Sequence, residues 1–446
     1  MLSDTASPEP GALFSDIRFA GRKTVVAAVS GGGDSLALLF LLQDFLERQP
    51  SGPSLLAVTV DHGLRPDSAT EARAVGELAA ARGIAHRTLR WEEAKPKAGI
   101  SAAAREARLA LLARAAREAG TDLVFTAHTA DDQAETLAMR LSRGGGRGAA
   151  GIAPATLFEG DVWFTRPLLH TRRAALRTYL GERGISWFED PSNRDPRFER
   201  ARVRACLDED RTQALLAEAE NAQRLRQEQG RAAADLIGSA ATRVAPGLLR
   251  FALAAASEEK GGLYALRIVL AVAGGSPHLA DEARSAALLR RALEDERCRV
   301  SLSRAVVTRK RDWLYLHRER RNLPETSLSG EQIWDGRYRL VPAGQLKGAC
   351  VAAFGPANAA ARDVAEAEAP AGLLRSALAA EPAIWRGDLC LGLASDMEGL
   401  VLQRLAQPWA RLLPSFDLAP ASALLELLNG SVPPILPFDG HKEQMG

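Results

Sequence analysis

Residues 22 to about 205 alternate short β-branched runs with longer segments whose apolar residues recur every three or four positions. The runs predicted as strands are Val25–Val29, Leu55–Val60, His86–Trp91, Asp122–Thr126 and, with a weaker pattern, Val162–Arg166. The segments predicted as helices are Ser35–Glu47, Ala69–Arg82, Ser101–Ala119, Asp131–Ser142 and Arg172–Arg183. Four or five βα units in succession predict an α/β fold with a doubly wound parallel sheet.

The pattern changes near Cys206. The following stretch to residue 240 is polar with sparse apolar positions, which predicts a solvent-exposed connector helix. Residues 241–320 are predicted to be mostly helical, with a strand within 306–316, whereas 321–446 combines Pro, Gly and short strand-like runs such as Tyr338–Val341. We therefore predict an α/β domain over 1–205, a connector helix over 206–240, a helical domain over 241–320 and a small mixed α+β domain over 321–446.

Composition agrees with a folded protein of several domains. The chain has 446 residues, of which 46% are hydrophobic and 25% charged, which excludes a disordered, collagen-like or coiled-coil protein. The 57 basic and 55 acidic residues leave a formal charge of +2, so any nucleic-acid-binding surface must be local. Only seven of the basic residues are lysine, and arginine is the side chain that suits phosphate and base edges.

Cysteine usage and hydropathy concern the cellular setting. The four cysteines lie far apart and form no CxxC pair, which favours a reducing cytoplasm and no thiolate metal site. The longest apolar run, Leu36 to Leu42, is far too short to cross a membrane, and the N-terminal segment is acidic. We expect neither export nor membrane insertion.

A glycine-rich loop follows the first predicted strand and opens an apolar helix. It consists of Ser30, Gly31, Gly32, Gly33, Asp34 and Ser35. A strand that turns into a helix N-terminus in this way presents backbone N–H groups and two hydroxyls to a phosphate-type anion. A Walker loop would place a lysine near its end, and here Asp34 stands where a cation bridging phosphates could be held. A simple tight turn is the alternative.

Two further motifs also follow predicted strands directly. Residues 60–68 read VDHGLRPDS, and 128–136 read HTADDQAET. Ligands of open α/β sheets lie beyond the carboxyl ends of the strands, so Asp61 and His62 should face the same crevice as the glycine-rich loop. A helix-capping turn is the alternative for the first of these motifs.

The second motif carries paired carboxylates. Asp132 and Glu135 are three residues apart at the start of a helix, so they share one face. Two like charges held this close favour a cationic partner, either magnesium or an ammonium group. Asp131 or Asp132 opens the helix, and Asp131 is also a plausible N-cap.

The arginine-rich segment 140–204 contains 13 arginines, no lysine and seven acidic residues, a local charge of +6. Such a concentration favours contacts with nucleic-acid phosphates, although an ordinary solvated surface is the alternative.

The motifs together resemble one family. SGGGDS alone resembles the hallmark loop of the PP-loop ATP pyrophosphatases. The order and spacing over 22–205 are similar to those of the tRNA(Ile)-lysidine synthases, and the matching strings are SGGGDS, VDHGLRPDS, AREAR at 104–108, HTADDQAET, RPLL at 166–169 and WFEDPSN at 187–193.

The resemblance implies a function and a set of roles. Such ligases use ATP to adenylate the wobble cytidine of isoleucine tRNA with a CAU anticodon and then join L-lysine to its carbon 2, releasing AMP and pyrophosphate. By motif position Ser30, Gly31, Gly32, Gly33 and Ser35 would hold pyrophosphate, Asp34 would bind magnesium, and Asp61, His62 and His128 would complete the ATP site. Asp132 and Glu135 would bind the lysine amine, and Arg105 and Arg108 would neutralise the α-phosphate.

The same resemblance implies how the tRNA would bind, and three alternative functions stay open. The tRNA would lie along the arginine-rich segment, with the domains at 241–320 and 321–446 binding its distant parts; whether the chain forms a homodimer is left open. A tRNA-thiolating enzyme would need cysteines before residue 206, and a glutamine-dependent amidotransferase would need an N-terminal cysteine where Leu2 stands. A non-catalytic RNA-binding scaffold that retains the nucleotide pocket is a third alternative.

Overall fold

The computed structural model describes residues 5–65, 67–190, 195–342, 348–363 and 369–438. Pro66 and residues 191–194, which belong to two of the motifs, lie outside the described residues. The chain forms two compact units. The first comprises Met1–Arg226, Pro414–Phe416 and Pro434–Gly446, and the second comprises Gln227–Leu413 and Asp417–Pro433.

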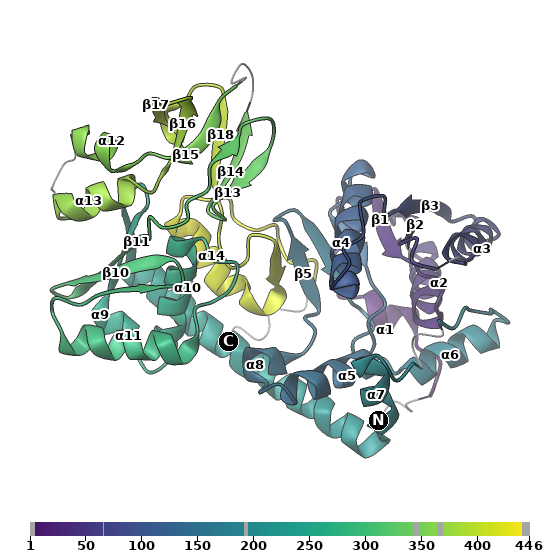
Figure 1. The fold of residues 1–446 in the computed structure, drawn as a ribbon. Helices are drawn as coiled ribbons and strands as arrows, with labels where there is room; N and C mark the ends of the chain where they lie inside the picture. Colours follow the sequence, from purple (N-terminus) through teal and green to yellow (C-terminus); the bar gives the residue numbers. More distant parts are fainter. Residues whose placement is uncertain (1–4, 66, 191–194, 343–347, 364–368, 439–446) are drawn as a thin grey trace. The chain divides into compact units, whose positions relative to one another are not determined.

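A mainly parallel sheet forms the centre of the first unit (Figure 1). The strands that residues 24–165 contribute to it are β1 (Thr24–Ala28), β2 (Ser54–Asp61), β3 (Ala85–Arg90), β4 (Leu123–Phe125), β5 (Ala155–Phe158) and β6 (Val162–Thr165). They lie in the order β5-β6-β4-β1-β2-β3, and neighbours pair in parallel except β5 with β6. The predicted doubly wound sheet is confirmed; the antiparallel β5 was not predicted.

Helices cover both faces of this sheet. They are α1 (Pro10–Phe14), α2 (Gly33–Glu47), α3 (Ser68–Ala80), α4 (Ile100–Glu118), α5 (Ala130–Leu141), α6 (Arg173–Glu182) and α7 (Glu199–Cys206), with a 3₁₀ turn η1 (Gly146–Ala150). In Figure 1, α4 lies on one side of β1 and β2, and α2 and α3 lie on the other. Residues Leu36–Leu42 of α2 are all buried, as expected for a helix that is apolar on every side. Among the described residues, no helix has the length and apolarity needed to cross a membrane.

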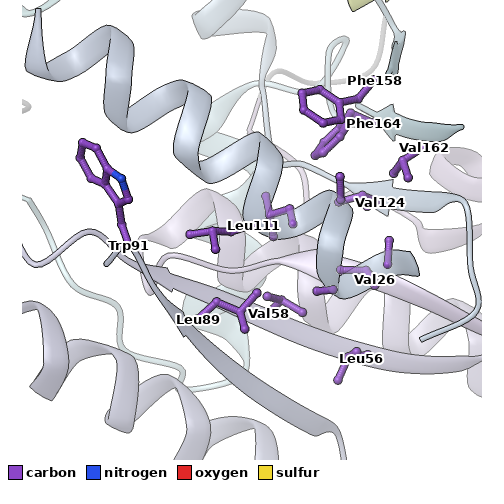
Figure 2. Packing of buried hydrophobic residues seen from close by; sticks show 14 residues of the cluster. Val26, Leu56, Val58, Leu89, Trp91, Leu111, Val124, Phe158, Val162 and Phe164 are labelled. Atoms are coloured by element: carbon purple, nitrogen blue, oxygen red, sulfur yellow. The ribbon is translucent and has the colours of Figure 1, made fainter. Parts of the chain in front are cut away.

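The packing of α4 on the sheet positions part of the site (Figure 2). Leu111 and Leu112 of α4 pack in one buried cluster with Val26, Val58 and Leu89 from three neighbouring strands. β-branched residues suit this two-sided burial in a parallel sheet. The cluster fixes the helix whose other positions carry two of the predicted arginines.

Among the described residues, the second unit contains three sheets. The boundary between the units falls within the long helix α8 (Glu209–Ala240). A helix therefore covers most of the segment 206–240 that was predicted as a connector helix. The first sheet has the order β7-β8-β11-β10-β9, and its strands are β7 (Ala241–Ala245), β8 (Leu248–Ala252), β9 (Arg299–Leu302), β10 (Ala305–Lys310) and β11 (Trp313–Arg318). With it are the helices α9 (Leu253–Ala256), α10 (Gly262–Gly274) and α11 (Glu282–Glu294). The expectation that 241–320 is mostly helical was therefore wrong. A short apolar run such as Leu248–Ala252 is too short for its hydrophobic periodicity to distinguish a strand from a helix.

The remainder of the chain is mixed, as predicted. Its strands are β12 (Thr326–Ser327), β13 (Gln332–Trp334), β14 (Tyr338–Pro342), β15 (Cys350–Ala353), β16 (Pro382–Arg386), β17 (Leu389–Leu393), β18 (Leu400–Arg404) and β19 (Leu412–Pro414). Its helices are α12 (Pro356–Ala361), α13 (Ala371–Leu378) and α14 (Leu418–Leu427), with 3₁₀ turns η3 (Ala394–Asp396) and η4 (Ser415–Asp417). The second unit's other two sheets run β12-β15-β16-β17 and β13-β14-β18. The finer domain boundaries at 205/206, 240/241 and 320/321 stay a prediction.

Candidate active site

Three of the motifs follow neighbouring strands of the parallel sheet. β1 lies between β2 and β4, and the three strands run in the same direction, so their carboxyl ends meet at one edge. The chain proceeds to β2 and β3 on one side of β1 and to β4 and β6 on the other, so the strand order reverses here. Ligands of open α/β sheets bind at such a point. The fold thus brings the three motif loops to one edge.

The glycine-rich loop makes a tight turn between β1 and α2. Gly31 has a φ of +82°, a left-handed conformation that glycine adopts without strain. The Ser35 hydroxyl donates to the Gly32 carbonyl oxygen at 2.8 Å and accepts from the Ser30 backbone N–H at 3.1 Å. Since α2 begins at Gly33, the positive end of its dipole lies at this turn. The geometry suits a phosphate-type anion.

Two aromatic residues cover this loop, a contact that the sequence did not predict. The backbone N–H of Phe188 donates to the Gly31 carbonyl oxygen at 3.0 Å. A Cβ atom on Gly31 would lie 3.1 Å from the Phe188 ring, and one on Gly33 would lie 3.3 Å from Trp187. Close packing therefore favours glycine at both positions, and at Gly31 the backbone conformation favours it as well.

Replacing Gly31 by alanine is expected to destabilise the protein more than replacing Gly83. Both glycines have positive φ, but a Cβ on Gly83 would meet nothing within 4 Å, whereas one on Gly31 would meet Phe188 and Val75. Gly83→Ala should lower the free energy of unfolding by about 1–2 kcal/mol from backbone strain alone. Gly31→Ala should lose about 1–3 kcal/mol more from overpacking. Urea unfolding measures both, and equal losses would show that the ring does not press against residue 31.

The amino terminus of α5 is capped by a residue outside the predicted pair. Thr129 is the N-cap: its hydroxyl accepts from the Asp132 N–H at 3.3 Å, and Asp132 Oδ2 accepts from the Thr129 N–H at 2.8 Å. Asp131, the predicted alternative cap, instead accepts the Arg173 N–H at the start of α6 at 2.7 Å. Asp131 thus caps a different helix, which the sequence pattern could not show.

Asp132 and Glu135 form an acidic notch that three arginines fill. Glu135 Oε1 accepts from Arg204 Nε at 2.6 Å, and its Oε2 accepts from Arg200 Nε at 2.7 Å. Asp132 Oδ1 accepts from Arg200 and Arg173, each at 3.0 Å. The predicted affinity of these carboxylates for a cation is therefore met, in this structure, by guanidinium groups of the same chain.

The notch lies next to the glycine-rich loop. Arg173 Nε donates to Asp34 Oδ2 at 3.1 Å, while the Nη atoms of the same guanidinium contact Asp132 at 3.0 Å and Glu135 at 3.4 Å. One planar group thus spans Asp34 and the acidic notch. The notch also borders a cavity of about 120 Å³, and Arg172 and Glu209 are among the residues that line it.

Burial and the arginines shift the acidic pKa values in opposite directions. Glu135 is 1% exposed, and burial alone would raise its pKa, but the hydrogen bonds and charges of Arg204, Arg173 and Arg200 outweigh burial and lower it. At Asp34 burial outweighs Arg173, and the pKa is raised. Glu135 therefore keeps its negative charge at neutral pH.

A group of arginines lies close enough to Arg200 for their charges to repel one another. Within the part of the chain that the structure describes, Arg105 and Arg108 of α4 make no ion pair. Burial, with repulsion from Arg105 and Arg200, lowers the pKa of Arg108 to about 10. Burial, with repulsion from Arg105 and Arg108, lowers that of Arg166 to about 9. An excess of positive charge in a partly desolvated site favours an anion.

The predicted histidines and Asp61 lie at the same edge. His62 packs edge-to-face on Trp91 with centroids 6.1 Å apart, and its Nδ1 is buried without a hydrogen-bond partner. Burial and the nearby arginines hold the pKa of His128 well below its usual value, so its imidazole is neutral at neutral pH. Asp61 Oδ1 accepts from the Gly63 N–H at 2.8 Å. This carboxylate therefore also stabilises the loop that follows β2.

The sequence missed the residues that join the motifs. Arg173, Arg200 and Arg204 were predicted only as members of a phosphate-binding segment, and in the structure they bind carboxylates. Trp187 and Phe188 were noted within a motif without a role. No signal of spacing could have paired residues that are 38 to 139 positions apart.

Comparison with known proteins gives consistent matches. The PP-loop domain family matches residues 8–210. A tRNA(Ile)-lysidine synthase from Mesorhizobium japonicum is 46% identical over 459 aligned positions, covering 99% of each chain. One from Brucella ovis is 40% identical, covering 74% of this chain and 76% of its own. Among solved structures, a U34-tRNA thiolase from Methanococcus maripaludis superposes with a TM-score of 0.41 at 17% identity, covering 49% of this chain and 78% of that chain.

Proposed function

The chain belongs to the tRNA(Ile)-lysidine synthase family, and we propose that it is a carbon–nitrogen ligase that joins L-lysine to carbon 2 of the wobble cytidine of tRNA(Ile) with a CAU anticodon. ATP is the energy-supplying substrate, as in a PP-loop enzyme. The observation that carries the proposal is the single guanidinium of Arg173, which contacts both Asp34 of the glycine-rich loop and the acidic notch. A phosphate site and an amine site this close can serve successive steps on one base. A tRNA substrate supports a cytoplasmic location for the enzyme.

The first step would be adenylation of the cytidine. The cytosine O2 atom attacks the α-phosphorus of ATP, and the bond to pyrophosphate breaks. Ser30, Gly31, Gly32, Gly33 and Ser35 would hold the departing pyrophosphate at the helix N-terminus, with Asp61, His62 and His128 around the nucleotide. Arg105 and Arg108, which lack counter-ions, would meet the charge that develops on the α-phosphate.

Asp34 fits a magnesium ion that accompanies the phosphates. Its Oδ2 accepts from Arg173, whereas its Oδ1 makes no hydrogen bond to the described residues, and the side chain is 26% exposed. Magnesium needs only one or two carboxylates when phosphates and water complete its octahedral shell. Bound there, it would neutralise phosphate charge beside the loop.

The second step would be attack by lysine. The ε-nitrogen attacks carbon 2 of the adenylated cytidine, the bond to the AMP oxygen breaks, and the amine loses a proton. Asp132 and Glu135 would hold the ammonium group, since the arginines that occupy them show the affinity of this notch for a cation. The adjoining cavity would admit the rest of the amino acid.

The tRNA itself would contact those arginines of the arginine-rich segment 140–204 that do not hydrogen-bond to the acidic notch. Arg197 is 85% exposed at its side chain and, among the described residues, forms an ion pair with Asp195 alone, and Arg143 is 68% exposed. Exposed arginines of this segment can exchange surface carboxylates for phosphates at little cost. The segments 241–320 and 321–446 would bind more distant parts of the tRNA.

Labelled lysine tests the proposal directly. Purified protein is incubated with ATP, radiolabelled lysine and total bacterial tRNA, and the labelled RNA is then identified. We expect label in tRNA(Ile) with the CAU anticodon alone, and none when ATP is omitted. A transcript with uridine in place of the wobble cytidine is the matched control. Label in other tRNAs, or in that control, would contradict the assignment.

A further inference from the structure

Arg173 contacts two sites, and in the proposed reaction each of them must bind a charged ligand. Among the described residues, it alone hydrogen-bonds to Asp34 and also to the acidic notch. Its side chain is 17% exposed, and the surrounding carboxylates raise its pKa against the effect of burial, so the guanidinium stays charged. The contacts lie at 3.0 to 3.4 Å.

The notch has no free position for an ammonium group while these contacts last. Arg200 and Arg204 occupy both oxygens of Glu135, and Arg173 and Arg200 share Asp132 Oδ1. Asp132 Oδ2 is used by the Thr129 backbone. A lysine ammonium can therefore approach only after one guanidinium leaves. Among the described residues, Arg200 and Arg204 make no hydrogen bond to Asp34, so Arg173 is the arginine of the notch that directly adjoins the glycine-rich loop.

We propose that Arg173 is a positioning residue that couples nucleotide binding to lysine binding. When phosphates occupy the glycine-rich loop, its guanidinium moves from the carboxylates to phosphate oxygens and opens the acidic notch. The inference rests on the proposed function, because it takes phosphates and lysine as the ligands of the two sites. Lysine bound before the nucleotide would have to displace this guanidinium itself.

The local structure allows the side chain to move without the helix. The Arg173 backbone N–H is held by Asp131 Oδ2 at 2.7 Å, which anchors the first turn of α6. Guanidinium bonds to carboxylate and to phosphate are both charge-assisted and often bidentate, so the guanidinium keeps an anionic partner after the exchange. The Coulomb attraction of several phosphate charges supplies the driving force.

The expected consequence is positive coupling between the two substrates. If nucleotide removes a competitor from the notch, lysine binds more tightly in its presence, and linkage requires the reciprocal effect on nucleotide. We expect at least about a fivefold decrease in the lysine Kd when nucleotide saturates the wild-type protein.

Equilibrium dialysis with radiolabelled lysine tests this coupling. The lysine Kd is measured with and without saturating α,β-methylene-ATP and magnesium for the wild type, Arg173→Gln and Arg183→Gln. Arg183 stands at the end of the same helix, where it contacts Asp44 and Glu182 instead of the notch. We expect the ratio of the two Kd values to fall to about one in Arg173→Gln and to stay at the wild-type value in Arg183→Gln. Arg173→Lys keeps the charge but cannot span both sites, so it should also lose the coupling, and it serves if the Gln variant does not fold.

Two results would overturn the inference. One is a wild-type lysine Kd that nucleotide does not change, and the other is coupling that persists in the Arg173 variants. Either result alongside lysine incorporation into tRNA(Ile) removes the coupling role and leaves the proposed function intact. Failure of the wild type to incorporate lysine would instead remove the proposed function.

Discussion

Replacement of Asp34 by alanine is expected to lower the rate of lysine- and tRNA-dependent pyrophosphate release at least a hundredfold. The carboxylate is the first acidic group of α2 beside the glycine-rich loop, and its Oδ1 has no partner among the described residues. Loss of a group that holds a phosphate-bound metal removes several kcal/mol of charge stabilisation, and a hundredfold corresponds to about 2.7 kcal/mol. Pyrophosphate release under saturating ATP, lysine and tRNA is the measurement.

A control on the same helix separates this effect from damage to the fold. Glu47 lies at the far end of α2 and is hydrogen-bonded to Gln43 at 2.7 Å, so Glu47→Ala should leave turnover unchanged. Unfolding of both variants in urea establishes that each is folded. Asp34→Asn, which keeps the shape and loses the charge, should resemble Asp34→Ala. Unchanged turnover in folded Asp34→Ala would end the assignment of Asp34 to the metal.

Substitution of Glu135 is expected to raise the KM for lysine far more than the KM for ATP. Glu135→Gln keeps the volume of a side chain that is 1% exposed but removes the charge proposed to bind the ammonium group. A charge-assisted hydrogen bond contributes about 1.5–3 kcal/mol, so the lysine KM should rise roughly ten- to a hundredfold. The KM for ATP should change by no more than about twofold, because the phosphate site is built from other residues.

The alanine variant at this position should behave differently in one respect. Glu135→Ala should show the same selective rise in the lysine KM, but Arg200 and Arg204 then lose every side-chain acceptor at this position, whereas Glu135→Gln keeps an amide oxygen that can accept from them. Because these two arginine side chains are 38% and 34% exposed, water compensates part of the loss, and the cost in folding free energy is about 1–3 kcal/mol. Glu118→Gln, on the surface of α4, is the control for both measurements. Equal rises in the two KM values would contradict the amine-binding role.

The elements of the first unit were predictable because their signals are local. Strand β1 was expected at 25–29 and lies at Thr24–Ala28, and α4 was expected at 101–119 and lies at Ile100–Glu118. Periodicity, β-branching and loop glycines act within a few residues, so a single sequence reveals them. The same reasoning failed over 241–320, where short apolar runs such as Leu248–Ala252 form strands that only their sheet partners stabilise.

The candidate site likewise has one part that local sequence signals predict and another that they do not. The sequence alone was sufficient to identify the loop at 30–35, the carboxylates Asp132 and Glu135 on one helical face, and their attachment to strand ends, because each depends on contacts between near neighbours. The tertiary structure decided which cations meet those carboxylates: Arg173 lies 139 positions from Asp34, and Arg204 lies 69 positions from Glu135. It also decided that Phe188 packs against Gly31 and that Asp131 caps α6. Contacts between residues so far apart along the chain depend on how helices and strands pack, and no local periodicity encodes that packing.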